Sequence, residues 1–106
     1  MSTTANVNLA LARQVMTEVE SYITRNGGGY GGWYAGIATD PRARLFRDHG
    51  VDEKNGAWIC RDCGTDATAR YVEDYFLRKG CAGDSGGGDS STKHFYACRM
   101  TRTTNP

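Results

Sequence analysis

The sequence contains no apolar run that approaches the length of a membrane span, which requires about 20 consecutive apolar residues. Its first residues lack the basic leader and the unbroken apolar core of a secretory signal peptide. We therefore expect a cytoplasmic protein without a membrane partner, and we expect its four cysteines to be reduced.

Charge of one sign is not in excess either. The 13 basic residues are nearly balanced by 12 acidic residues, which leaves a net charge of +1. Overall charge thus gives no argument for a nucleic-acid partner, and any basic binding surface must be local. There is no internal repeat, and the length of 106 residues predicts a single domain over residues 1–106.

Apolar residues recur every four positions near the N-terminus, which predicts an amphipathic helix within residues 1–26. Asn26 and Gly27 are expected to end this helix, because both tolerate a left-handed conformation. The residues of the apolar stripe are Val7, Leu11, Val15, Val19 and Ile23.

Residues 32–101 read as an alternation of strands and helices, followed by a tail at residues 102–106. Strands are expected near residues 32–39, 57–63 and 93–101, and helices near residues 41–49 and 66–79. Asp40 and Thr65 or Asp66 are the expected N-terminal caps. This order predicts an α/β (α+β) fold, a small three-layer sandwich in which helices flank a short, mostly central β-sheet.

One junction between a strand and a helix carries a distinctive set of residues, WYAGIATDPRARLFRDH at positions 33–49. It contains Tyr-X-Gly at Tyr34 to Gly36, and Arg44 follows eight residues after the glycine. These residues resemble the second motif of the GIY-YIG endonuclease superfamily. Glu73, in ARYVEDYFL, resembles the metal-binding glutamate of a later helix in that family. The resemblance covers about half of the chain and implies a GIY-YIG-like core with an extra N-terminal helix.

The resemblance also implies a function, the metal-dependent hydrolysis of DNA phosphodiester bonds. Tyr34 would act as the general base, Arg44 would hold the phosphate, and Glu73 would bind Mg²⁺ or Mn²⁺. The other residues expected at the site are His49 for catalysis and Gly36, Arg42 and Arg47 for substrate binding.

Two parts of the family pattern have no clear counterpart in the sequence. The first motif of the family is a strand with Gly-Ile-Tyr, and the corresponding region here reads SYITRNGGGYGG. Tyr22 and Tyr30 are the candidates for the missing tyrosine. The family often has an asparagine after the glutamate, and the only asparagine after Glu73 is Asn105.

An alternative function follows from these differences. The chain is then a catalytically inactive binding module for nucleic acid, a nucleotide or a protein, such as a small phage or bacterial accessory or inhibitor protein. The N-terminal helix could form a homodimer, because its apolar stripe is long for one small sheet to cover.

The cysteines and the second glycine-rich segment each allow more than one interpretation. Cys60 and Cys63 form a CxxC pair that could bind zinc together with Cys81 and Cys98. Within a strand, however, Cys60 and Cys63 would face opposite ways, so reduced core cysteines are the better interpretation. Residues 80–91 are expected to form a flexible surface loop. The alternatives are a lid with Asp84 and Asp89 near a metal, or a loop whose backbone amides bind phosphate.

Overall fold

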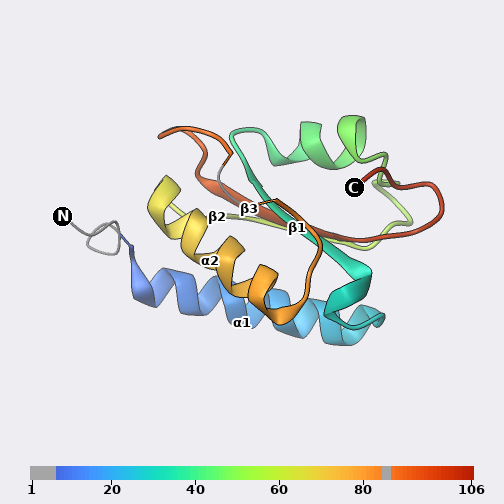
Figure 1. Cartoon of the computed structure of the whole chain (residues 1–106), viewed down its shortest axis with the longest axis horizontal. Coiled ribbons are helices and arrows are strands. Elements are labelled where there is room, and N and C mark those ends of the chain that lie inside the picture. Colours follow the sequence, from blue (N-terminus) through green and yellow to red (C-terminus); the bar gives the residue numbers. More distant parts are fainter. Residues whose placement is uncertain (1–6, 85–86) are drawn as a thin grey trace.

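The computed structural model describes residues 7–84 and 87–106, and these form an α+β domain of three layers (Figure 1). Helices α1 and α2 lie on one face of a three-stranded sheet, and the short helix η3 lies on the other face. The fold class expected from the sequence is therefore confirmed. In chain order the elements are α1 (Leu9–Asn26), η2 (Tyr30–Gly32), β1 (Trp33–Ala38), η3 (Ala43–Asp48), β2 (Trp58–Asp62), α2 (Asp66–Lys79) and β3 (His94–Arg99).

The sheet has the strand order β1-β3-β2, and both pairs are antiparallel. The last strand of the chain therefore lies in the middle of the sheet. In its register Gly36 of β1 lies opposite Tyr96 of β3, and Cys60 of β2 flanks Tyr96 from the other side. This arrangement brings the C-terminal part of the chain beside the Tyr-X-Gly stretch.

Capping residues set the ends of α1 and α2; the end of α1 at Gly27 and the start of α2 at Thr65 are as the sequence predicts, and Asn8 is an additional cap. The Asn8 side chain accepts the Leu11 N–H at the start of α1, and Gly27, with φ of 76°, ends it. Thr65 caps α2, and Gly80 ends it in the left-handed conformation. Residues 1–6 of the predicted N-terminal segment lie outside the described residues.

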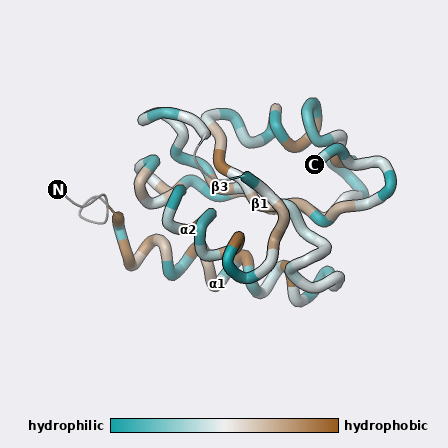
Figure 2. Tube along the Cα trace, viewed as in Figure 1, coloured by the Kyte–Doolittle hydropathy of each residue, from teal (hydrophilic) through white to brown (hydrophobic). Residues whose placement is uncertain are grey.

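The main core lies between the sheet and the pair α1 and α2. The apolar stripe of α1 is buried there at Ala12, Val15, Val19 and Ile23, and Figure 2 shows hydrophobic and hydrophilic positions alternating along this helix. Val7 and Leu11 at the start of the stripe are half-buried against the same core. Because the stripe packs within the chain, it gives little reason for a homodimer, which stays a prediction.

A second, smaller core holds η3 against the opposite face of the sheet. Leu45 of η3 is fully buried against Tyr96 and Cys98 of β3 and against Val51. The segment is shorter and wider than the α-helix expected from the sequence, since residues 43–48 form a π-helix. The His49 N–H donates to the Arg44 carbonyl at 2.8 Å, five residues back, and this bond closes the wide turn. Such turns occur frequently at functional sites.

The four cysteines are free thiols distributed over both faces of the sheet. Cys63 and Cys81 belong to the core beneath α1 and α2, whereas Cys60 and Cys98 pack on the η3 side. Burial raises the pKa of Cys63, Cys81 and Cys98 to about 11, so these side chains are protonated at neutral pH. The predicted opposite orientation of Cys60 and Cys63 is observed.

Within residues 7–84 and 87–106, no helix has the length and apolar character needed to cross a membrane.

Candidate functional site

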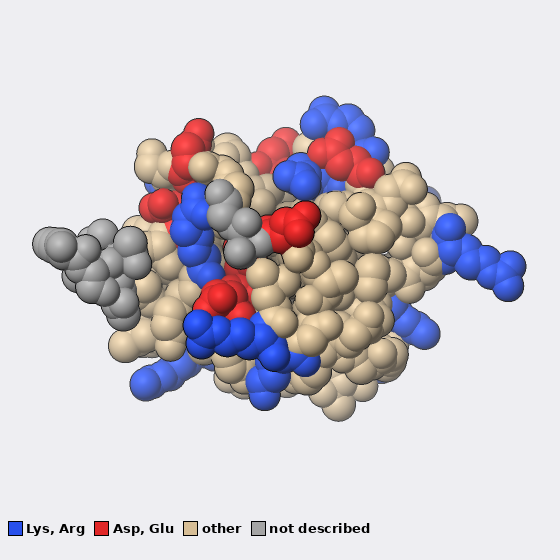
Figure 3. Space-filling model, in the orientation of Figure 1, with Lys and Arg blue, Asp and Glu red and all other residues tan. Residues whose placement is uncertain are grey.

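A cleft of about 670 Å³ opens between β1, η3, α2 and the segment that precedes β3. Five of the seven site residues predicted from the sequence line it. Basic and acidic side chains lie next to each other on the face seen in Figure 3, in keeping with the balanced net charge. The predicted residues at the cleft are Tyr34, Gly36, Arg44, Arg47 and Glu73.

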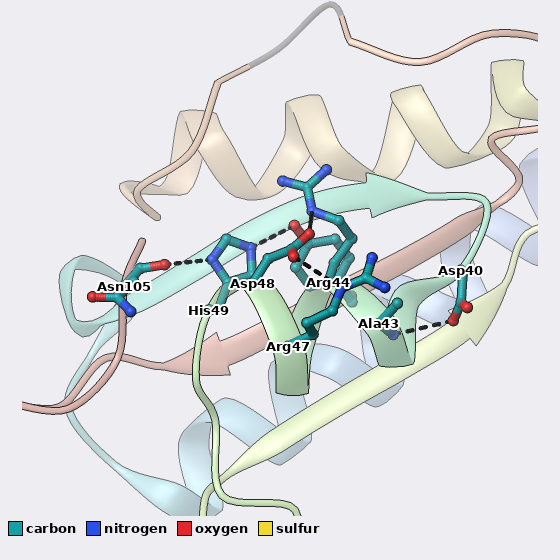
Figure 4. A network of polar contacts seen from close by, with 8 residues as sticks. Asp40, Ala43, Arg44, Arg47, Asp48, His49 and Asn105 are labelled. Carbon is teal, nitrogen blue, oxygen red and sulfur yellow. Dashed lines mark hydrogen bonds and ion pairs between the residues drawn. The ribbon is translucent and has the colours of Figure 1, made fainter.

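Two arginines on η3 form the basic wall of the cleft. Asp48 lies between them, and its carboxylate pairs with Nε of Arg44 at 3.1 Å and with Nε of Arg47 at 3.3 Å (Figure 4). The terminal nitrogens of both guanidinium groups have no partner among the described residues. Asp48 thus orients two arginine forks whose remaining donors are free to bind an anion with several oxygens, such as phosphate.

Arg42 lies away from this cleft. Its guanidinium is ion-paired with Glu53. It also lies over the rings of Phe46 and Trp58, at 5.0 Å and 5.4 Å from their centroids. The predicted role of Arg42 in substrate binding therefore has no support from its position, although Asp40 caps the turn at Ala43 as expected.

Two tyrosine rings form the floor of the cleft, and the His49 ring supports them from behind. Tyr34 and Tyr96 line it, with ring centroids 6.3 Å apart, and His49 packs behind them at 4.6 Å from Tyr34 and 5.5 Å from Tyr96. His49 is only 4% exposed. Its Nε2 lies 2.8 Å from the Tyr96 hydroxyl, and its Nδ1 lies 2.7 Å from the Asn105 carbonyl oxygen.

Tyr96 is the residue that the sequence analysis missed. The proposed substitutes for the missing tyrosine lie elsewhere: Tyr22 packs against Trp33, and Tyr30 packs against Phe76, both on the α1 and α2 side. Tyr96 reaches the cleft because β3 pairs with β1 in the centre of the sheet. A period-two pattern could have placed Tyr96 and Cys98 on the same face, but nothing local reveals which strand is the neighbour.

Burial controls the pKa of both tyrosines. Desolvation raises the pKa of Tyr34, and the nearby Arg44 guanidinium opposes that rise only in part. Desolvation also raises the pKa of Tyr96, again against the effect of Arg44. Without a bound cation, both hydroxyls are therefore protonated at neutral pH, and the arginine alone does not make Tyr34 a base.

Glu73 is a buried carboxyl group on the α2 wall of the cleft. Only 3% of the residue is exposed, and its carboxyl oxygens have no hydrogen-bond or ion-pair partner among the described residues. Desolvation raises its pKa to about 7, and Arg70 only partly offsets this rise. A buried carboxylate without a partner is unfavourable. A cation or hydrogen-bond donor that binds Glu73 in the cleft would remove part of this cost.

The glycine-rich segment after α2 is attached to the edge of the sheet. The Ala35 N–H donates to the Ala82 carbonyl, and the Ala82 N–H donates to the Trp33 carbonyl, each at 2.9 Å. This pairing places Asp84 on the cleft, and Asp89 also lines it. Residues 85 and 86 of the predicted loop lie outside the described residues.

Metal ligands are sparse in this arrangement. In the described part of the chain, no group of three or more His, Cys, Asp or Glu side chains could hold a metal ion. The site offers Glu73, with the exposed Asp84 on the same cleft. Mg²⁺ commonly takes only one or two protein carboxylates and keeps several waters.

Comparison of the chain with family models, with curated proteins and with solved structures found no match.

Proposed function

We propose that this protein is a divalent-metal-dependent endonuclease that hydrolyses DNA phosphodiester bonds in the cleft between β1, η3 and α2. One observation carries the proposal: a single cleft holds two arginines, each paired with Asp48 only through Nε, two tyrosines, and a buried carboxyl group without a partner among the described residues. Phosphodiester hydrolysis needs groups of these kinds, because the phosphate must be held, a water must lose a proton and negative charge must be stabilised.

The arginines and the carboxyl group have separate functions in this proposal. Arg44 and Arg47 bind non-bridging phosphate oxygens through the nitrogens that Asp48 leaves free. Glu73, with Asp84 nearby, would hold Mg²⁺ or Mn²⁺, which suits the oxygen donors present. When bound, such an ion supplies charge stabilisation at the phosphate.

The resemblance to the GIY-YIG endonucleases supports the same function. Tyr34, Arg44 and Glu73 come from three separate elements, and they line one cleft as that resemblance implies. Tyr96 of β3 is a second tyrosine on the cleft, and in this proposal it would serve in place of the tyrosine of the first motif. Arg42 is not part of the proposed site.

The test is cleavage of supercoiled, linear, branched and single-stranded DNA in the presence of Mg²⁺ or Mn²⁺. We expect metal-dependent cutting, and we expect Glu73→Gln to lower its rate by at least about 100-fold, on the scale of losing one charge-stabilising group. Asp74→Asn is the matched control. Asp74 is the next residue of α2, but it is half-exposed and paired with Arg78. Equal rates for the two variants would contradict the role of Glu73.

Binding of DNA gives a second prediction, which does not depend on turnover. Arg44→Ala should weaken binding of a DNA duplex. It should also reduce the slope of the logarithm of the association constant against the logarithm of the salt concentration by about one, the value for one lost phosphate contact. Arg78→Ala is the control, because the Arg78 side chain is 80% exposed on the far end of α2 and pairs with Asp74. Fluorescence anisotropy titrations at low and at moderate salt measure the association constant and its salt dependence for each variant. An equal loss in the two variants would mean that the cleft does not hold the phosphate.

A binding module without catalysis is the second candidate, and the tyrosines favour it. Burial raises the pKa of both Tyr34 and Tyr96, which makes each a weaker acid and leaves the hydroxyl protonated. Binding of DNA that depends on Arg44, with no cutting of any substrate by folded protein, would support this alternative.

A further inference from the structure

The C-terminal residues pack against His49 behind the cleft. The Asn105 N–H donates to the His49 carbonyl at 2.7 Å, and the Asn105 carbonyl oxygen lies 2.7 Å from His49 Nδ1. The backbone of Asn105 therefore contacts both the main chain and the ring of His49, and Figure 4 shows the contact to the ring. A turn stabilises the segment, because the Thr101 N–H donates to the Thr104 hydroxyl at 2.9 Å. Residues 102–106, a tail in the sequence-based prediction, thus contact His49 behind the cleft.

This contact determines the tautomer of His49. A carbonyl oxygen can only accept a hydrogen bond, so the proton of the neutral ring must be on Nδ1. Nε2 is then unprotonated and accepts a hydrogen bond from the Tyr96 hydroxyl at 2.8 Å. In water the two tautomers would compete, and the Asn105 carbonyl removes that competition.

The two tyrosines of the cleft differ in consequence. Tyr96, which is 1% exposed, has an acceptor for its proton directly behind it. The Tyr34 hydroxyl has no hydrogen-bond partner among the described residues. Among the residues that the structure describes, Tyr96 is therefore the cleft tyrosine connected to a group that can accept its proton.

We propose that residues 101–106 are a positioning element that holds His49 as the Nδ1–H tautomer, so that Tyr96 and His49 together form the proton acceptor of the cleft. This inference rests on the proposed function for its catalytic part. Tyr96 touches the reacting water, His49 acts through Tyr96, and Asn105 acts through His49.

The proton transfer balances without an additional reactant. As the water oxygen forms its bond to phosphorus, its proton passes to Tyr96 Oη, and the original Tyr96 proton passes to His49 Nε2. The P–O bond to the leaving group breaks, and the leaving oxygen keeps the electron pair and takes a proton from solvent. His49 becomes an imidazolium whose Nδ1–H remains bonded to the Asn105 carbonyl, and it later returns its proton to solvent.

The first test is ¹⁵N NMR of the histidine rings in the full chain, with a His94→Gln variant to assign the two residues. We expect His49 to carry its proton on Nδ1 in the wild type and in Asn105→Ala, which keeps both backbone contacts. A chain that ends at Arg102 should lose this preference. A proton on Nε2 in the wild type, or an unchanged tautomer in the shortened chain, would overturn the proposal.

If the shortened chain does not fold, the Tyr96→Phe variant tests which contact fixes the tautomer of His49. The variant removes the hydroxyl but keeps the ring and the C-terminal segment. We expect the Nε2 signal to shift while the proton stays on Nδ1. A mixture of tautomers in this variant would show that Tyr96, rather than Asn105, fixes the ring, and would overturn the assignment.

Cleavage assays test the catalytic part separately. We expect the chain that ends at Arg102 to show a kcat about 100-fold lower, as for loss of general-base catalysis, with little change in KM because Arg44 and Arg47 remain. If the wild type cuts no DNA, the proposed function fails, while the NMR result still decides the positioning of His49. Full turnover in a shortened chain that has lost the tautomer would refute the proton path alone.

Discussion

Substitution of Gly36 by alanine should lower the free energy of unfolding by about 1–3 kcal/mol, as over-packing of a core does, and should separate Tyr96 from His49. A Cβ atom on Gly36 would lie 2.6 Å from Oη and 2.7 Å from Cζ of Tyr96. The Tyr96 ring cannot retreat easily, because it is buried in the small core with Leu45 and Cys98. We therefore expect the ring to move and its 2.8 Å hydrogen bond to His49 to break.

Thermal unfolding measures the stability effect, and a loss of about 2 kcal/mol corresponds to a melting temperature about 10 °C lower for a domain of this size. Gly31→Ala is the matched control, since a Cβ at Gly31 has no atom within 4 Å. The histidine NMR signals report the broken contact independently. An unchanged melting temperature with unchanged His49 signals would show that Tyr96 does not lie over Gly36.

Glycine at this position thus has a specific function in the sheet. Because Gly36 is directly opposite Tyr96 in the register of β1 and β3, the missing side chain makes room for the Tyr96 ring on the η3 side. The sequence predicts Gly36 at the substrate, and Gly36 does line the cleft. Its clearest role, however, is to place the aromatic floor of that cleft.

The elements of the fold could be predicted because their signals are local. A four-residue apolar repeat, the cap at Thr65, and the glycines at positions 27 and 80 lie within or beside the segments that they define. The wide turn of η3 could not be predicted, because it depends on how Leu45 packs against Tyr96 and Cys98.

The candidate site was predictable only where the signal for a residue lies within one continuous segment of the sequence. Tyr34 and Arg44 belong to one continuous motif, and Glu73 is conspicuous as a carboxylate on the apolar side of α2. Tyr96 and Asn105 depend on long-range pairing, since β3 must insert between β1 and β2 before either residue can reach His49. No pattern in residues 102–106 indicates that pairing.

Replacement of Glu73 by glutamine should stabilise the protein at alkaline pH and leave its stability unchanged at acidic pH. Burial raises the pKa of Glu73 from 4.5 to about 7, so the folded state binds a proton more tightly than the unfolded state. The wild type consequently loses stability as the pH rises through the window from 4.5 to about 7. The full loss corresponds to about 3 kcal/mol, and glutamine, which is never charged, avoids it.

Urea unfolding of both proteins at pH 4 and pH 8 tests this expectation, because the other titrating groups cancel in the difference. Asp74→Asn is again the control for removing one carboxylate from α2, because Asp74 is half-exposed and ion-paired with Arg78 rather than buried without a partner. A difference between wild type and Glu73→Gln that is the same at both pH values would contradict the buried, unpaired state of Glu73.

Divalent cations should reverse the effect of this substitution. A ligand that binds only the folded state stabilises it by mass action, so Mg²⁺ or Mn²⁺ at pH 8 should raise the stability of the wild type toward that of Glu73→Gln. The same ions should leave the variant unchanged, because it has lost the charge that they would pair with. At pH 5 the wild type should respond weakly, since protons occupy Glu73 and compete with the metal. If the ions stabilise both proteins to the same extent, the metal binds away from Glu73. Such a result would contradict the metal-dependent chemistry proposed for this cleft.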